Sequence, residues 1–171
     1  RKEAVKGLAS LKSKQHSDTL MNLSEGQDNR VRRAIWNALR NYKNNDDVST
    51  FLQNVVSRDS KYYSVSDAFR ALVVVDTIAA RKKVDALLIR DSHQDVIRSS
   101  AISFFGSVKS DKNYNRLKEL ASYGGTTWDA RPEAVSQLSR YAKEKRETID
   151  IFVNLLEDRS RDVRRLSLIH I

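Results

Sequence analysis

The stretch that decides the fold is Val31-Arg32-Arg33-Ala34-Ile35-Trp36-Asn37-Ala38-Leu39. Its apolar side chains at the first, fifth, sixth and ninth places share one face of an α-helix. At steps of 33 residues along the chain, residues at the same four places are again mostly apolar. The repeated stretches begin at Ser64, Ile97, Ala130 and Val163. A repeat carried through four steps predicts a stack of similar helical units.

A second helix is expected in each unit, after a polar turn. Its apolar residues are Phe51, Leu52, Val55 and Val56, then Val84, Leu87 and Leu88, then Leu117, Leu120 and Ala121, then Ile151, Phe152, Leu155 and Leu156. One hairpin of two helices cannot bury its own apolar face, whereas stacked hairpins bury a continuous core. The expected fold class is therefore all-α, a right-handed α-solenoid of helical-hairpin repeats with a period of 33 residues.

The composition agrees with a helical chain whose outer faces are charged. Apolar residues make up 40% and charged residues 31% of the sequence, with one Pro and five Gly. Pro132 falls in the first turn of an expected helix, where no N–H partner is needed. The expected N-caps are Asp46, Asp111 and Ser160, and Gly106 is expected to end its helix as a C-cap.

The repeat also predicts the organisation of the chain. We expect a single repeat domain over 1–171, because the period never breaks. The expected units are approximately 1–25 (partial), 26–57, 58–90, 91–123, 124–157 and 158–171 (partial). The chain starts without Met and ends on an apolar stretch, so we expect it to be a piece of a longer protein. No long apolar run is present, so no membrane span is expected.

The run Val31 to Leu39 has the form V-R-x-x-A-h-x-A-L and resembles a HEAT repeat. Three stretches are more particular: 58–72 (RDSKYYSVSDAFRAL), 91–101 (DSHQDVIRSSA) and 117–131 (LKELASYGGTTWDAR). Together they are similar to the C-terminal HEAT-like region of zinc aminopeptidases of the aminopeptidase N (membrane alanyl aminopeptidase) family. The resemblance covers about Gly26 to Ile171. It implies HEAT-like repeats here and a zinc site in a separate upstream domain.

Two departures from that pattern stand out. Ser64-Val65 takes the place of the expected Val-Arg pair, and Phe104-Phe105 replaces a small residue followed by Leu. The catalytic motif of the family is absent from this chain, so the resemblance carries no catalytic residue over.

No catalytic, metal or cofactor site is expected in this chain. Zinc hydrolysis needs H-E-x-x-H, which places two imidazoles one helical turn apart and a Glu beside them. His16, His93 and His170 stand far apart, and none has a neighbouring Glu. There is no Cys for thiolate chemistry. The sequence therefore predicts a chain that is not an enzyme.

Arginines at equivalent places of the repeat predict a structural ladder. They are Arg32, Arg98, Arg131 and Arg164. Carboxylates that precede the first helices recur near them, and these are Asp28, Asp59, Asp95 and Asp158. We expect Asp–Arg pairs to hold the turns between units, with ligand binding as the alternative. Val65 breaks the ladder, so its unit should be held more by packing.

Basic residues are expected to form a stripe along one edge of the stack. The formal net charge is +9, and nine cations fall at or near the turns between first and second helices. They are Lys43, Arg81, Lys82, Lys83, Lys109, Lys112, Lys143, Lys145 and Arg146. Such a stripe fits an acidic partner, and simple solvation of a charged surface is the alternative.

Nucleic-acid bases stack on exposed aromatic side chains, but the aromatic side chains of this chain are expected to pack in the core or on a turn. Trp36, Phe69, Phe104 and Phe105 take core places in the repeat, and Trp128 is expected to pack on the turn before its helix. Base recognition is therefore not expected.

The function expected from these patterns is a non-catalytic scaffold, C-terminal to a zinc aminopeptidase-like domain and in contact with it or with another subunit. The alternative is a free-standing binding module for an acidic partner, either protein or nucleic acid. A DNA-repair enzyme on the same scaffold, as in a HEAT-like DNA glycosylase family, is a third hypothesis. We further expect self-association through the apolar C-terminal end, and a cytoplasmic location.

Overall fold

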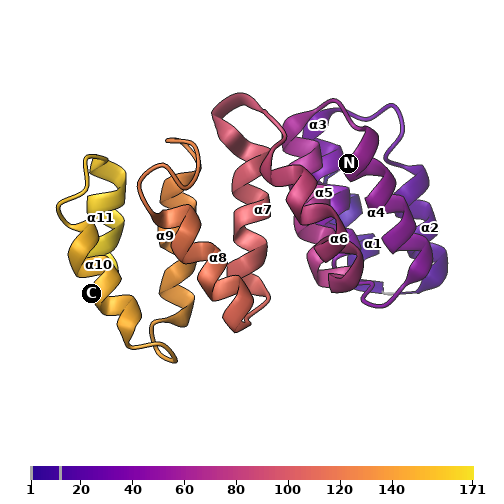
Figure 1. The fold of residues 1–171 in the computed structure, drawn as a ribbon. Coiled ribbons are helices and arrows are strands. Elements are labelled where there is room, and N and C mark those ends of the chain that lie inside the picture. Colours follow the sequence, from indigo (N-terminus) through magenta and orange to yellow (C-terminus); the bar gives the residue numbers. More distant parts are fainter. Residues whose placement is uncertain (1, 12) are drawn as a thin grey trace. The chain divides into compact units, whose positions relative to one another are not determined.

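The computed structural model describes residues 2–11 and 13–171, and this part of the chain is helical without any strand. It divides into two compact units, Arg1–Arg90 and Asp91–Ile171. The division falls between two of the expected repeats, 58–90 and 91–123. Each unit is built from pairs of helices joined by short turns (Figure 1). The structure thus confirms the all-helical fold class.

Unit 1 contains three successive helix pairs. They are α1 (Lys2–Leu11) with α2 (Lys14–Asn22), α3 (Asn29–Leu39) with α4 (Asp46–Arg58), and α5 (Tyr62–Val75) with α6 (Thr77–Leu88). Helix α5 packs against α3, α4 and α6, and α3 also packs against α1. First helices therefore contact first helices, as stacking of hairpins requires.

Unit 2 continues the same pattern of first and second helices. Its elements are η1 (His93–Asp95), α7 (Val96–Ser107), α8 (Asp111–Ala121), α9 (Arg131–Leu138), η2 (Ser139–Tyr141), α10 (Glu147–Leu155) and α11 (Arg161–His170). Helix α9 packs against α7, α8 and α11. The five stretches expected as first helices coincide with α3, α5, α7, α9 and α11, except that Ala130 is the N-cap of α9 and Ile171 follows α11. Their first residues are not evenly spaced, so a strict period of 33 is not confirmed.

The core of unit 1 is made by the residues that the repeat places on one helix face. Ile35, Trp36 and Leu39 of α3 are fully buried, as are Phe69 and Leu72 of α5. The indole Nε1 of Trp36 donates a hydrogen bond of 2.8 Å to the Ser64 hydroxyl, so this large ring is buried without an unsatisfied polar group.

The core of unit 2 follows the same rule in α7 and α9. Ile97, Ala101, Ile102 and Phe105 are buried in α7. The corresponding residues of α9 are also buried, namely Ala134, Val135 and Leu138. In α11 the pattern holds only in part: Val163 and Ser167 are buried, whereas Leu168 and Ile171, which were expected at core places, are exposed.

Two of the three expected N-caps are wrong by one residue. The side chain of Asn45 accepts a hydrogen bond from the Val48 N–H, and Ser110 caps α8 in the same way, so Asp46 and Asp111 are the first helical residues instead. Carboxylates there still face the positive end of the helix dipole. Ser160 is the N-cap of α11, as expected.

Gly106 is not a C-cap, because α7 continues to Ser107. A Cβ at Gly106 would lie 2.1 Å from the side-chain Oε1 of Gln137 in α9, a distance that no carbon can occupy. The glycine therefore lets α7 and α9 approach each other closely. No helix of the described residues is long and apolar enough to cross a membrane.

Phe105 provides a direct test of the core. Replacement of Phe105, which is 5% exposed, by Ala should lower the free energy of unfolding by about 3–5 kcal/mol. The control is Leu168→Ala in the same unit, at a side chain that is 68% exposed; its effect should stay within about 0.5 kcal/mol. Urea denaturation measures both, and equal midpoints for the two variants would show that Phe105 does not hold the core.

Candidate interaction surfaces

Two arginines of the predicted ladder bind a carboxylate of the next hairpin. The Arg32 guanidinium in α3 pairs with Asp59, and Arg131 in α9 pairs with Asp158. Each Asp comes 27 residues after its Arg. Asp59 lies in the turn between α4 and α5, and Asp158 lies in the turn between α10 and α11. Arg131 binds both carboxylate oxygens of Asp158, and its Nε donates a 2.8 Å hydrogen bond to the Ala121 carbonyl. The ladder therefore joins successive hairpins.

The expected local pairing of Asp28 with Arg32 is wrong. Asp28 is the N-cap of α3, and its carboxylate accepts hydrogen bonds of 2.8 and 3.0 Å from the N–H groups of Arg30 and Val31. A carboxylate placed just before a helix satisfies the free amides of the first turn. The guanidinium of Arg32 consequently reaches forward to Asp59.

The two ladder carboxylates are held in their charged form. Burial raises the pKa of Asp59, but hydrogen bonds from the Lys61 N–H, the Ser64 hydroxyl and Arg32 outweigh it and leave the pKa below its ordinary value. The pKa of Asp158 is lowered in the same way, because the contact with Arg131 and the Ser160 N–H outweigh burial. Both carboxylates are committed to the fold, which argues against their use as ligands for a partner.

The other two ladder arginines are held differently. Arg98 pairs with Asp95 in its own hairpin and lies 3.1 Å from both the Asp91 carboxylate and the Thr127 hydroxyl. Arg164 donates to the carbonyl oxygens of Asp158 and Arg159 at 2.6 and 3.1 Å. These two arginines stabilise turns of unit 2, as expected, although Arg164 does so through backbone carbonyls.

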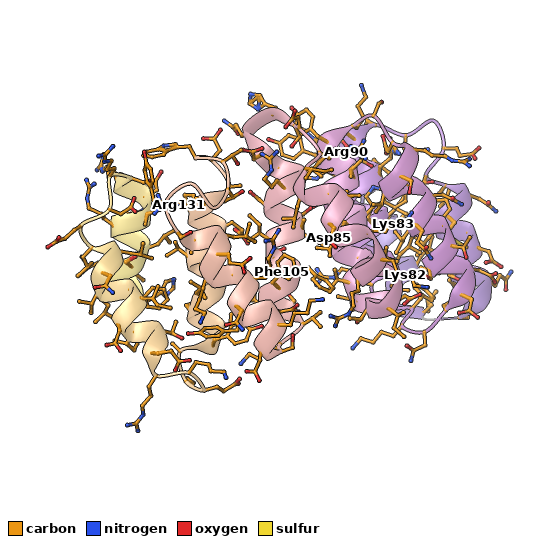
Figure 2. All side chains as sticks on the ribbon, in the orientation of Figure 1. Lys82, Lys83, Asp85, Arg90, Phe105 and Arg131 are labelled. Carbon is orange, nitrogen blue, oxygen red and sulfur yellow. The ribbon has the colours of Figure 1, made fainter. Side chains whose placement is uncertain are left out.

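Val65, where the ladder is interrupted, is fully buried in α5. Arg90, which the repeat pattern did not single out, compensates with hydrogen bonds of 2.9 and 2.8 Å to the carbonyl oxygens of Val56 and Asp59. Figure 2 labels Arg90 in unit 1 and Arg131 in unit 2. In the sequence, the hydrogen bonds from Arg90 to these carbonyl oxygens are signalled by a basic residue that follows the second helix.

The predicted basic stripe is placed unevenly. Lys43 lies in the turn between α3 and α4, as expected, but Arg81, Lys82 and Lys83 lie within α6 rather than at the turn. The reason is that the turn before α6 is a single residue, Asp76, whose side chain accepts from the Ala79 N–H.

In unit 2 the basic residues lie at the expected turns, but two of them are neutralised. Lys109 pairs with Glu144 and Lys145 with Asp111, each at 2.5 Å. The hydrogen bond and charge of Lys145 lower the pKa of Asp111, and Asp111 raises the pKa of Lys145 in return. The remaining three lie at the same turns and are Lys112, Lys143 and Arg146.

The positive charge of the chain is concentrated in unit 1. Residues 1–90 include 17 Lys and Arg against 10 Asp and Glu, whereas residues 91–171 include 14 against 12. Unit 1 therefore carries most of the net charge of +9. An acidic partner would be attracted mainly to this unit.

The four aromatic residues expected in the core, Trp36, Phe69, Phe104 and Phe105, are buried, but other aromatic side chains are exposed. Trp128 is 56% exposed and Tyr123 is also exposed, both in the turn between α8 and α9. The Arg159 guanidinium lies 5.6 Å from the ring centroid of Tyr123, within the range of a cation–π contact. The glycines after Tyr123 allow a tight turn at the end of α8: Gly124 has a φ of +78°, and a Cβ at Gly125 would lie 1.8 Å from the Glu119 carbonyl oxygen.

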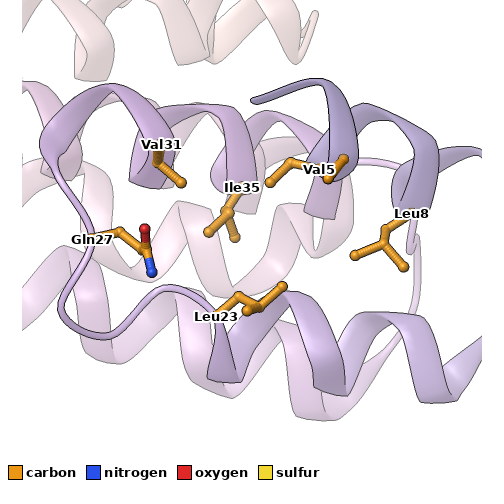
Figure 3. A pocket seen from close by; sticks show the side chains of 7 residues that line it. Val5, Leu8, Leu23, Gln27, Val31 and Ile35 are labelled. Atoms are coloured by element: carbon orange, nitrogen blue, oxygen red, sulfur yellow. The ribbon is translucent and has the colours of Figure 1, made fainter. Parts of the chain in front are cut away.

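An open apolar cavity of about 260 Å³ lies between α1 and α3 (Figure 3). It is lined by Ala4, Val5, Leu8, Leu23, Gln27, Val31 and Ile35. Only Gln27 contributes a polar side chain to this lining. The sequence pattern placed Val31 and Ile35 in the core but did not predict that space would remain beside them.

The three histidines lie on separate elements, in α2, η1 and α11. Within the residues that the structure describes, no three His, Cys, Asp or Glu side chains are arranged to hold a metal ion.

In a comparison with known families, residues 1–73 match the family model described as HEAT repeats. No curated protein and no solved structure matched the chain. The matched segment covers α1 to α4 and most of α5, which are stacked helix pairs. The family match and the all-helical structure together support a HEAT-repeat architecture, while the resemblance to aminopeptidase N stays a hypothesis.

The ladder pair in unit 2 should be energetically important. Both side chains are nearly inaccessible, so Arg131→Met should leave an unpaired buried carboxylate and cost on the order of 3–5 kcal/mol. The matched control is Arg165→Met. Arg165 Nη2 lies 3.9 Å from Asp162 Oδ1 and both side chains are exposed, so this ion pair should contribute little to stability. Urea unfolding should leave the control nearly unchanged; a similar loss in both variants would contradict a specific role for the ladder.

The lowered pKa of Asp158 predicts an acid-sensitive stability. The charged carboxylate stabilises the fold above its unfolded pKa of about 4, and this contribution is lost as pH falls through the lower folded pKa. Asp158→Asn should therefore be less stable than wild type at neutral pH and should lose less stability on acidification. Parallel pH dependence of the urea midpoints in both proteins would contradict this prediction.

Proposed function

We propose that this chain is a non-catalytic scaffold that binds a protein partner. HEAT repeats typically serve as scaffold or interaction modules, and the family match over residues 1–73 is the observation that carries the proposal. The Arg–Asp links support it, because they fix successive hairpins and leave the outward helix faces available.

The partner we propose is a zinc aminopeptidase-like domain encoded upstream in the same chain. The three stretches that resemble the aminopeptidase N family support this assignment. In this proposal the chain itself binds no zinc or cofactor, and the upstream domain supplies the metal and the reaction. The scaffold would restrict access to the active site or hold the protein's assembly, and we place it in the cytoplasm.

Self-association is a second mode of binding that the exposed surface supports. Leu168 and Ile169 of α11 and the following Ile171 are all more than half exposed. Exposed apolar side chains that lie together favour association.

The proposal predicts an H-E-x-x-H motif a few hundred residues upstream in the gene, and a stable complex between that region and this chain. The two should be purified separately, mixed and analysed by sedimentation. The destabilised ladder variant Arg131→Met should bind less well, whereas the exposed-site control Arg165→Met should bind like wild type. Lack of the motif would refute the aminopeptidase assignment. The motif without any complex would refute the scaffold role.

A further inference from the structure

The open apolar cavity of unit 1 has the size of one large side chain. Its volume is about 260 Å³, and six of the seven described residues that line it have apolar side chains (Figure 3). An apolar cavity of about 150 Å³ holds benzene, which has about six non-hydrogen atoms, so this cavity has room for about ten. Pockets for whole drug-sized ligands begin at about 300 Å³. The cavity therefore suits one large apolar group better than a complete cofactor.

The cavity is a feature of unit 1 alone. All of its described lining residues lie within residues 4–35, on α1, at the end of α2, in the following turn and on α3. Helix α3 packs against both α1 and α5, and the cavity lies on the α1 side. The chain leaves unit 1 at Arg90, after α6. The cavity is thus defined by contacts within the first two helix pairs.

The lining passes from a closed floor to an accessible rim. Val5 and Ile35 are 4% and 0% exposed, whereas Leu23 is 43% exposed. A water molecule held in such a space needs two to four polar partners, which apolar side chains do not supply. An apolar group that enters the cavity releases this water and also covers Leu23, and both changes favour binding.

The walls of the cavity are held by the local backbone. The Leu23 N–H donates a 2.9 Å hydrogen bond to the Thr19 carbonyl, which fixes the end of α2. Gly26 then takes a φ of +65°, a conformation that glycine adopts without strain, and the chain turns so that Gln27 joins the lining. Asp28 caps α3 directly afterwards. A preformed site loses little entropy when a partner side chain enters it.

We propose that this cavity is the anchor site for a tryptophan side chain of a protein partner. A tryptophan side chain has about ten non-hydrogen atoms, which matches the volume. Its indole N–H needs an acceptor when it is buried, and the amide of Gln27 in the lining carries an oxygen with two acceptor positions. Tryptophan is enriched among the residues that anchor protein interfaces in pockets. This assignment rests on the scaffold function proposed above and names the group that holds the partner.

Fluorine NMR of N-acetyl-5-fluorotryptophan amide, titrated with the full chain, tests whether the cavity accepts this side chain. We expect saturable broadening of the fluorine signal, and unlabelled N-acetyl-tryptophan amide should reverse it. Added salt should leave the binding unchanged, because the probe is uncharged. N-acetyl-leucine amide should compete at least tenfold less well, because its smaller side chain leaves part of the cavity without contacts.

Two variants place an aromatic ring in the cavity itself. Val31 is 9% exposed, so the larger side chain of Val31→Phe extends into the empty space, and Ala4→Phe adds a ring at an exposed residue of the lining. Each should weaken probe binding at least tenfold without lowering the urea midpoint, and Ala4→Phe keeps the test valid if Val31→Phe does not fold. The matched control is Leu11→Phe, at a side chain of α1 that is 59% exposed and outside the described lining; it should bind like wild type.

The proposal is overturned if the folded cavity variants bind the probe like wild type, or if N-acetyl-leucine amide competes as well as N-acetyl-tryptophan amide. The complex with the upstream region should also be at least tenfold weaker with Ala4→Phe than with Leu11→Phe. A complex that forms normally with Ala4→Phe, although the probe no longer binds, would keep the scaffold function and assign the cavity to a free indole-like molecule. Probe binding by wild type without any complex would refute the scaffold function instead.

Discussion

A two-helix hairpin cannot bury its own apolar face, and the rest of this structure depends on that constraint. Each first helix is covered by its neighbours: α5 packs against α3, α4 and α6, and α9 packs against α7, α8 and α11. Large side chains such as Trp36 and Phe69 are thereby removed from water completely. Because inward faces are committed to neighbouring helices, interaction with other molecules is left to the outward faces and the turns.

Polar contacts decide how the hairpins are aligned. Arg32 and Arg131 each reach a carboxylate 27 residues ahead, and hydrogen bonds keep those carboxylates charged despite burial. Both links span 27 residues, although the first helices of the repeats start at uneven intervals. Arg98 and Arg164, at equivalent places of the repeat, make local contacts instead.

The sequence predicted the helices and most of their buried residues, because the spacing of apolar side chains is a local property. The sequence-based predictions were wrong where the position of a residue depends on contacts between helices. Gly106 is required by the side chain of Gln137, which lies far away in the sequence. The exposure of Tyr123 and Trp128 depends on how the turn after α8 leaves the helices, and the position of Lys82 within α6 depends on a turn of one residue.

Hydrogen–deuterium exchange resolved by peptide would test the stacked architecture most directly. The account predicts the slowest amide exchange in α5 and α9, which are covered by three helices each, and fast exchange in the turn that carries Tyr123 and Trp128. Because exchange reports the free energy of local opening, this order follows from burial alone. Exchange in α5 and α9 as fast as in that turn would contradict the account.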